Sequence, residues 1–356
     1  MDAGKTQQYM QAYRPLVAIS VGDPAGIGPE ISLMALSEAS NYQLCRPLLV
    51  ASAKHMHLVN ELLKFGLKIN AISDVNDGVY ALGTVDVMDL DNVDMSSFAF
   101  NEVSAMCGNA SFEYVIKAIE LANAGLVDAT VTGPISKEAI HAAGHIYAGH
   151  TEIFAKYTGT SSYTMMLAEG NFRVVHVSTH VSLLNAIQRV KKDRVLQVIK
   201  LANDALKDMG IENPRIAVAG LNPHAGENGL FGDEEILEIV PAIEAAKSMG
   251  IGASGPYPAD TIFPQMHGGK FDMVVCMYHD QGHIPTKLLG FNYNHKTQTW
   301  EGLSGVNITL GLPIIRVSVD HGVAFDKGGL GTASPESMMQ AIKYASAMAG
   351  KRQGQS

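Results

Sequence analysis

The sequence contains no stretch of 18 consecutive apolar residues, so it offers no segment that could cross a membrane as a helix. It also has no run rich in lysine and arginine, and its formal net charge is −9 at pH 7. Because a protein that binds a phosphate backbone needs a basic face, nucleic acid is not an expected partner. Residues 1–15 lack the apolar core of a signal peptide and are expected to form a mobile arm. We therefore expect a soluble, cytoplasmic protein that binds neither a membrane nor nucleic acid.

Cysteine is scarce. The chain has three cysteines, Cys45, Cys107 and Cys276, which are widely spaced and form no Cys-x-x-Cys pair. An odd number of scattered cysteines argues against a disulfide framework and favours a reducing compartment. Cys276 lies in the apolar run MVVCM, where a buried thiol that packs like a small apolar side chain is the favoured interpretation.

The dominant pattern is an alternation of short β-branched runs with helical stretches, which predicts an α/β fold with a largely parallel sheet. The chain has 356 residues, 47% of them apolar, which suits about two domains. No linker rich in proline, glycine or serine divides it, so we expect these domains to share one continuous sheet. We predict strands over 15–21, 129–132, 173–177, 215–219 and 272–277, and helices over 110–124, 195–209, 234–249 and 335–349, the last capped by Ser334.

Three of the predicted strands lead directly into a polar turn that carries a histidine. These are FRVVHVSTH, ending at His180, RIAVAGLNPH, ending at His224, and MVVCMYHDQGH, which contains His279 and His283. The carboxyl ends of parallel strands lie along one sheet edge, where ligands bind in open α/β folds. Three converging imidazoles would suit a first-row divalent ion, although each histidine taken alone could simply cap a loop. Asp280 could orient His279 or cap the turn.

Two further segments have the layout of anion-binding sites. GDPAGIGPE (22–30) follows a strand and opens a helix, so it could present backbone N–H groups to an anion or form a plain tight turn. VTGPISKEA places Lys137 at the start of a helix, where a surface lysine and a substrate contact are both compatible with the pattern.

Cations near the end of the chain suggest an anionic substrate. Lys287 follows the His279 turn, and Arg316 interrupts the otherwise apolar strand pattern LGLPIIRVSV. Such a guanidinium either pairs with a structural carboxylate or binds a phosphate or carboxylate of the substrate. Asn307 in GVNITLGLP could join it, and the glycine-rich segment 320–336 suits either a nucleotide phosphate or a long loop.

Several motifs occur in an order that resembles the family of 4-hydroxythreonine-4-phosphate dehydrogenase. The resemblance runs from about Val17 to Ala347 and is carried by GDPAGIGPE, TGPISKEAI, GHTEIFA, LNPHAGE, PADTIF, YHDQGH and GVNITLGLPIIRVSVDHG. It implies a two-domain α/β fold like that of the isocitrate and isopropylmalate dehydrogenases, with a central cleft and a homodimeric assembly. It implies domains over approximately 1–130 plus 305–356 and over 131–304. The implied reaction is NAD-dependent oxidation of a phosphorylated hydroxy acid followed by decarboxylation.

The family's site residues can be carried over position by position. Its metal ligands fall on His180, His224 and His279, for one ion of Zn, Co, Mn or Mg per subunit at the subunit interface, and His180 matches the ligand that comes from the neighbouring subunit. Its substrate contacts fall on His150, Thr151, Lys287, Asn307 and Arg316. The ion is expected to lower the pKa of the hydroxyl group that is oxidised. Candidates for proton transfer are Lys287, Asp260 and Asp280, and the residues that bind NAD stay unassigned.

Two departures from the vitamin-biosynthesis type resemble the paralogous branch that acts on D-threonate or D-erythronate 4-phosphate and yields dihydroxyacetone phosphate. One is His283 with the segment that follows it, and the other is the long segment 291–305. The alternatives are 4-hydroxythreonine-4-phosphate dehydrogenase itself, in pyridoxal phosphate synthesis, and a dihydrodiol dehydrogenase of the same family. Because Lys287, Asn307 and Arg316 are all present, a phosphate is favoured over the latter. From other classes, a hydrolase with three histidines on its metal and a non-catalytic binding protein remain open.

Overall fold

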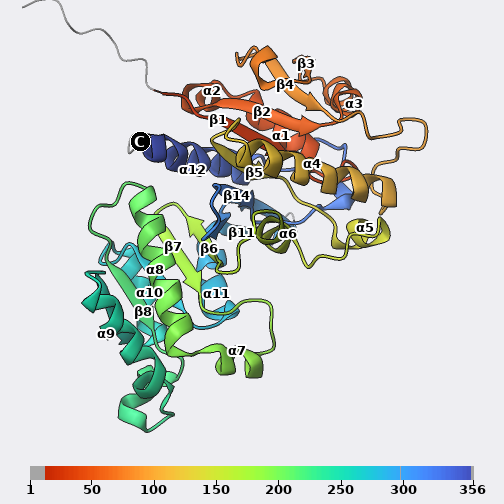
Figure 1. The fold of residues 1–356 in the computed structure, drawn as a ribbon. Coiled ribbons are helices and arrows are strands. Elements are labelled where there is room, and N and C mark those ends of the chain that lie inside the picture. Colours follow the sequence, from red (N-terminus) through yellow and green to blue (C-terminus); the bar gives the residue numbers. More distant parts are fainter. Residues whose placement is uncertain (1–12, 297, 354–356) are drawn as a thin grey trace, which may run out of the picture.

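The computed structural model describes residues 13–353 except residue 297, so most of the predicted N-terminal arm lies outside the described residues. Within this part the fold is α/β, built on one twelve-stranded sheet (Figure 1). In spatial order its strands are β3 (Lys68–Ile72), β4 (Thr84–Asp89), β2 (Arg46–Ala51), β1 (Leu16–Ser20), β5 (Ala129–Thr132), β14 (Arg316–Val319), β13 (Val306–Leu310), β6 (Thr164–Glu169), β7 (Phe172–His176), β10 (Met273–Cys276), β8 (Ile216–Ala219) and β9 (Ala253–Tyr257).

The prediction of a largely parallel sheet is confirmed. Eight of the eleven strand pairings in the described sheet are parallel, and all three antiparallel ones involve β13 or β6. Strands β1, β5, β8, β10 and β14 are buried along their whole length, as expected for strands covered on both faces by helices. Strands β13 and β6 join the two halves of the sheet without a break.

Helices pack on both faces of the sheet (Figure 1). They are α1 (Gly28–Leu36), α2 (Ala39–Leu44), α3 (Ala53–Leu63), α4 (Ala105–Asn123), α5 (Lys137–Ala142), α6 (His150–Tyr157), α7 (Leu183–Arg189), α8 (Lys192–Asp208), α9 (Val240–Ser248), α10 (Ala259–His267), α11 (His279–Gly290) and α12 (Glu336–Gln353). The predicted cap is confirmed, because the N–H of Glu336 donates to Ser334 Oγ at 3.3 Å. The helix predicted over 234–249 instead opens with a π-helical turn over Glu235–Ile239. None of the described helices is long and apolar enough to cross a bilayer.

The long segment 291–305 forms a small hairpin beside the main sheet. Its strands β11 (Phe291–Asn294) and β12 (Thr299–Leu303) pair antiparallel. The chain then returns through β13 and β14 to the half that contains β1–β5, and α12 packs there (Figure 1). The division into 1–130 plus 305–356 and 131–304 stays a prediction, since the sheet itself is continuous across it.

A buried histidine packs the first half of the sheet against the segment before α4. His55 in α3 has no exposed surface, and its ring lies 4.7 Å from that of Phe98 in an edge-on contact and 6.2 Å from that of Phe100. Neither ring nitrogen has a hydrogen-bond partner. Burial lowers the pKa of His55 to about 4, so the ring stays neutral at physiological pH.

This burial predicts part of the acid sensitivity of the fold. The folded pKa lies below the usual value of 6.5, so the stabilisation by neutral His55 is complete above that value and is lost as pH falls towards 4. Between pH 7 and pH 4, we expect the unfolding free energy of His55→Phe to fall by about 3 kcal/mol less than that of the wild type. Urea titrations at both pH values measure this, with exposed His57→Gln in the same helix as the control. Equal pH dependence in His55→Phe and the wild type would contradict the prediction.

Candidate active site

The three strands that lead to the predicted metal ligands are neighbours in the sheet. Strand β10 pairs in parallel with β7 on one side and with β8 on the other. The turns that follow them therefore leave the sheet at the same edge, as the sequence predicts. Each turn carries its histidine within a few residues of the strand end: His180 after β7, His224 after β8 and His279 after β10.

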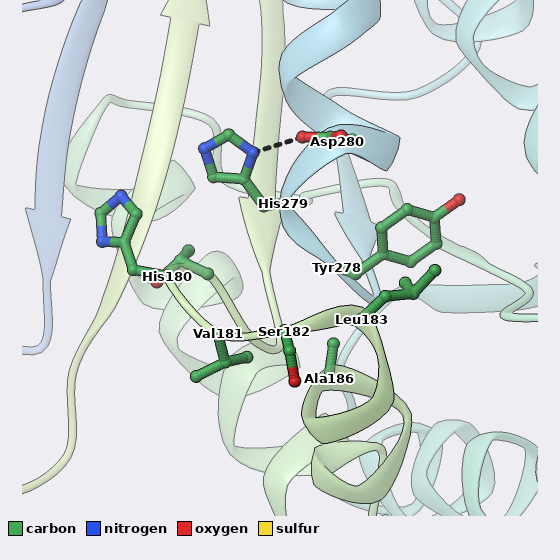
Figure 2. A pocket seen from close by; sticks show the side chains of 9 residues that line it. His180, Val181, Ser182, Leu183, Ala186, Tyr278, His279 and Asp280 are labelled. Atoms are coloured by element: carbon green, nitrogen blue, oxygen red, sulfur yellow. Dashed lines mark hydrogen bonds and ion pairs between the residues drawn. The ribbon is translucent and has the colours of Figure 1, made fainter.

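Two of these histidines face one another. The ring centroids of His180 and His279 are 5.7 Å apart, and both side chains line a cavity of about 500 Å³ (Figure 2). Asp280 Oδ1 lies 2.6 Å from His279 Nδ1, which leaves Nε2 of that ring as the atom available to a ligand. Asp280 thus orients His279, one of the two roles considered for it. Burial is the main cause that lowers the pKa of His180, and His279 and Lys137 add to it.

His283 stacks on the ring of His279. The two rings are stacked with centroids 3.5 Å apart and an interplanar angle of 12°. His283 Nδ1 lies 2.9 Å from the carbonyl oxygen of His279, and this contact restricts the rotation of the His283 ring. The ring of His176 follows at 4.8 Å from that of His283. A column of three imidazoles therefore holds His279 in one orientation.

His224 is separate from this pair. Its side chain is 65% exposed, and Nδ1 lies 3.1 Å from Glu227 Oε2. Residues 224–228 all have left-handed backbone angles, with φ between 43° and 79°, although each non-glycine residue there costs about 1–2 kcal/mol. Among the described residues, no three side chains of His, Cys, Asp or Glu gather closely enough to hold an ion. One chain therefore brings together two of the three predicted metal ligands.

Gln281 ties the two histidine turns together, and the sequence reasoning missed it. Its Oε1 accepts the N–H of Met277 at 2.6 Å, and its Nε2 donates to the carbonyl of Gly220 at 2.8 Å. The side chain is only 6% exposed. It joins the end of β10 to the end of β8, and its place directly after Asp280 in the YHDQG motif was the available signal.

Arg316 is a buried cation at the start of β14. It is 2% exposed, and its guanidinium lies over the ring of Phe154 at 5.6 Å. Nη1 and Nη2 donate to the hydroxyls of Thr309 and Thr132 at 3.1 and 2.8 Å, while Nε has no partner. None of the ion pairs among the described residues includes Arg316. Burial lowers its pKa to about 9, so the side chain remains charged at neutral pH.

Two other predicted substrate contacts have unfilled polar atoms. His150, the first residue of α6, has a buried Nε2 without a partner, and burial together with nearby Arg316 holds its pKa well below the usual value. Asn307 in β13 donates from Nδ2 to Met165 Sδ at 2.6 Å, while its Oδ1 is buried without a partner. Thr151 follows His150 and lines a second cavity of about 510 Å³, together with His180.

Acidic side chains influence both Arg316 and the His180–His279 pair. Glu152 raises the pKa of both Arg316 and His180, so it lies within range of each. Asp320, directly after β14, is half-buried; desolvation raises its pKa, and Lys287 and His279 oppose the rise. Sequence reasoning passed over Glu152 and Asp320. Asp320 follows a strand end as the histidines do, so the same argument could have found it.

Two of the three proton-transfer candidates lie in α11, and the third lies in α10. Lys287 lies in the last turn of α11, with Nζ 5.0 Å from the ring centroid of Phe291. Asp280 contacts His279 as described. Asp260 is exposed in the first turn of α10, and no hydrogen bond or ion pair among the described residues joins it to the other two.

Both glycine-rich segments use their N–H groups inside the protein. In the 22–30 segment, the N–H of Asp23 donates to Pro134 and that of Ile27 to Val323. In the 320–336 segment, Gly329 and Gly331 both donate to Glu30 Oε2 in α1, at 3.0 and 3.3 Å. Since these donors are occupied, the tight-turn and long-loop interpretations are favoured over phosphate binding.

Comparison with known proteins identifies the family. The family model described as pyridoxal phosphate biosynthetic protein PdxA matches residues 43–345. This chain belongs to the PdxA family. Among curated PdxA relatives, D-threonate 4-phosphate dehydrogenase of Cupriavidus necator is 42% identical over 96% of this chain and all of its own length. A protein of Symbiobacterium thermophilum, provisionally named D-threonate 4-phosphate dehydrogenase, is 46% identical over 94% of this chain and 98% of its own length. The branch predicted from the sequence is confirmed.

Solved PdxA structures share the fold. The Klebsiella pneumoniae structure titled 4-hydroxythreonine-4-phosphate dehydrogenase is 42% identical, covers 94% of this chain and 99% of its own, and gives a TM-score of 0.83. A terephthalate 1,2-cis-dihydrodiol dehydrogenase from Burkholderia xenovorans is 30% identical over 94% of this chain and 98% of its own, with a TM-score of 0.67. The chain is thus a dehydrogenase of the PdxA family with its isopropylmalate dehydrogenase-like α/β fold, and the predicted fold class is confirmed.

Proposed function

We propose that this protein catalyses the NAD-dependent and divalent-metal-dependent oxidation and decarboxylation of a phosphorylated four-carbon hydroxy acid. The preferred substrates are D-threonate 4-phosphate and D-erythronate 4-phosphate, and the product is dihydroxyacetone phosphate. The observation that carries the proposal is Arg316, a buried guanidinium without an acidic partner among the described ion pairs. The free, buried thiols of the three cysteines agree with a cytoplasmic location.

A phosphate group would satisfy the unfilled donors around Arg316. A buried cation is costly unless an opposite charge and hydrogen bonds compensate for it. Arg316 Nε–H and a neutral His150, which carries a single N–H, can both donate to phosphate oxygens. The amide of Asn307 supplies a further polar contact. A carboxylate of an aromatic acid could pair with Arg316, but it has only two oxygens. A phosphate has three oxygens that can accept from Arg316 and His150 together, so we favour a phosphorylated substrate over the dihydrodiol alternative.

The chemistry of His180 and His279 fits a divalent ion. Two imidazoles that face one another at 5.7 Å, one of them oriented by a carboxylate, are typical of part of a first-row metal site. Because the two rings belong to one chain and His224 stands apart, we propose that His224, rather than His180, comes from the neighbouring subunit. Zinc, cobalt, manganese and magnesium all remain candidates.

Exposed apolar side chains on α7 and α11 support a homodimer. Leu183 and Leu184 in α7 are 60% and 67% exposed, and Ile284 and Leu288 in α11 are 65% and 79% exposed. Both helices adjoin the turns that carry His180 and His279, and Leu183 lines the same cavity (Figure 2). Exposed apolar side chains of this size beside an incomplete site are expected at a subunit contact.

The remaining groups of the chain bind and orient the substrate and transfer protons. When bound, NAD supplies the oxidising power, and the ion lowers the pKa of the reacting hydroxyl and stabilises developing negative charge. Lys287 is the favoured proton-transfer group because it lies in the same helix as His279 and its charge acts on Asp320, directly after β14. Exposed Asp260 is a weaker candidate.

Kinetics with three substrates test the proposal. We expect NAD⁺ reduction with D-threonate or D-erythronate 4-phosphate to exceed that with 4-hydroxythreonine 4-phosphate in kcat/KM, with dihydroxyacetone phosphate as product. A chelator should abolish turnover, and the divalent ion should restore it. A higher kcat/KM for 4-hydroxythreonine 4-phosphate would favour the vitamin-biosynthesis alternative. Hydrolysis without cofactor reduction would favour a metal-dependent hydrolase.

A further inference from the structure

The turn that carries His224 has a strained backbone and an unusual support. We define the His224 turn as residues 222–228. Five consecutive residues in it are left-handed, and four of these are not glycine. Left-handed residues normally occur singly, so a run of five requires outside contacts that fix it.

Glu235 provides these contacts. It is 2% exposed and lies in the π-helical turn that precedes α9. Its Oε1 accepts the N–H groups of Leu221 and Asn222, both at 2.7 Å, and its Oε2 accepts Nδ2 of Asn222 at 2.9 Å. The carboxylate therefore occupies the donors at the entrance of the His224 turn. Single π-helical turns of this kind frequently occur at functional sites.

The fit between the His224 turn and Glu235 leaves no spare room. A Cβ atom on Gly226 would lie 2.8 Å from Glu235 Oε2. A Cβ atom on Gly220 would lie 3.1 Å from Oε1 and 2.7 Å from the Cα atom of Ala225. The carboxylate is thus packed against the backbone of the turn, while the side chain of His224 is 65% exposed.

We infer that Glu235 is a positioning residue for His224. Through the His224 turn it holds this imidazole in a fixed, exposed position from which it can complete a divalent-ion site with the His180–His279 pair of a second copy of the chain. The inference rests on the proposed function, because it requires His224 to be a metal ligand. A fixed turn avoids the ordering cost that a mobile loop would incur when the ion binds.

Cobalt binding by the intact dimer tests the inference. Glu235→Gln keeps the size of the side chain but replaces an acceptor with an amide that cannot accept from all three donors. We expect Co²⁺ affinity, measured by titration of its visible absorption, to fall about 10- to 100-fold. Amide hydrogen exchange in residues 222–228 should accelerate at the same time. Glu244→Gln is the matched control, since this exposed carboxylate in α9 pairs with Lys247.

Two further variants keep the result interpretable. Gly226→Ala retains Glu235 but adds a methyl group that would lie 2.8 Å from Glu235 Oε2. It should therefore also weaken Co²⁺ binding, which gives a second test if Glu235→Gln folds poorly. His224→Ala reports on the ligand itself. If His224→Ala binds Co²⁺ like the wild type, the proposed ligand role fails and the positioning role with it. If His224→Ala weakens binding but Glu235→Gln and Gly226→Ala do not, the positioning inference alone is overturned, even where stability falls.

Discussion

Arg316→Met is expected to lower kcat/KM for the phosphorylated substrate on the order of 100-fold. This loss corresponds to about 3 kcal/mol of transition-state stabilisation. The variant removes the charge-assisted hydrogen bonds that the buried guanidinium can make to phosphate. Arg316→Lys should recover little of the loss, because an ammonium lacks the planar fork of donors. Steady-state kinetics with D-threonate 4-phosphate measure both variants.

Unphosphorylated D-threonate separates this effect from a general defect. With it, Arg316→Met and the wild type should give similar, low kcat/KM values, since neither gains a phosphate contact. Without substrate the variant should be at least as stable as the wild type, because replacement of a buried charge by an apolar side chain is often neutral or stabilising. Arg215→Lys is the control, since this exposed arginine pairs with Asp272. Equal losses with both substrates would show that Arg316 does not bind the phosphate.

The second large effect concerns the division of the metal site between subunits. Each single replacement of a proposed ligand should lower kcat on the order of 1,000-fold, which corresponds to several kcal/mol of transition-state stabilisation. The variants are His180→Ala, His224→Ala and His279→Ala. Coexpression with two different affinity tags allows hybrid dimers to be purified. A hybrid of His279→Ala with His224→Ala subunits should recover about half of the wild-type activity, since one of its two sites is intact.

The pairing of variants identifies which ligand crosses the interface. A hybrid of His180→Ala with His279→Ala should stay inactive if both histidines serve the same site from one chain, as their 5.7 Å separation suggests. Activity in that hybrid, and none in the hybrid with His224→Ala, would place His180 across the interface as first expected from the family resemblance. Activity in neither hybrid would argue against a shared site.

The sequence predicted those parts of the molecule that depend on local periodicity and on chain direction. The strand over 129–132, the cap at Ser334 and the parallel arrangement of the three histidine strands could be derived because each follows from short-range patterns. The family motifs then supplied roles for Arg316 and His150.

Other features depend on contacts that no local pattern encodes. Strands β13 and β6 are short buried runs, and nothing in them indicates that they pair antiparallel within a parallel sheet. The left-handed run 224–228 contains mostly non-glycine residues, so propensity would not predict it. The missing acidic partner of Arg316 and the stack of His283 on His279 become visible only when distant segments are packed together.

The unbroken sheet has a consequence for which substrates can fit. Arg316 and Asn307, which are proposed to bind the phosphate, lie in β14 and β13, and the histidine pair follows β7 and β10. Strand β6 is hydrogen-bonded between β13 and β7. Strand spacing within the continuous sheet therefore contributes to the distance between the two anchoring points. On the proposed function, this spacing favours substrates in which the distance between the phosphate and the reacting hydroxyl matches it. Acids with longer or shorter carbon chains are then expected to bind with the hydroxyl away from the metal ligands.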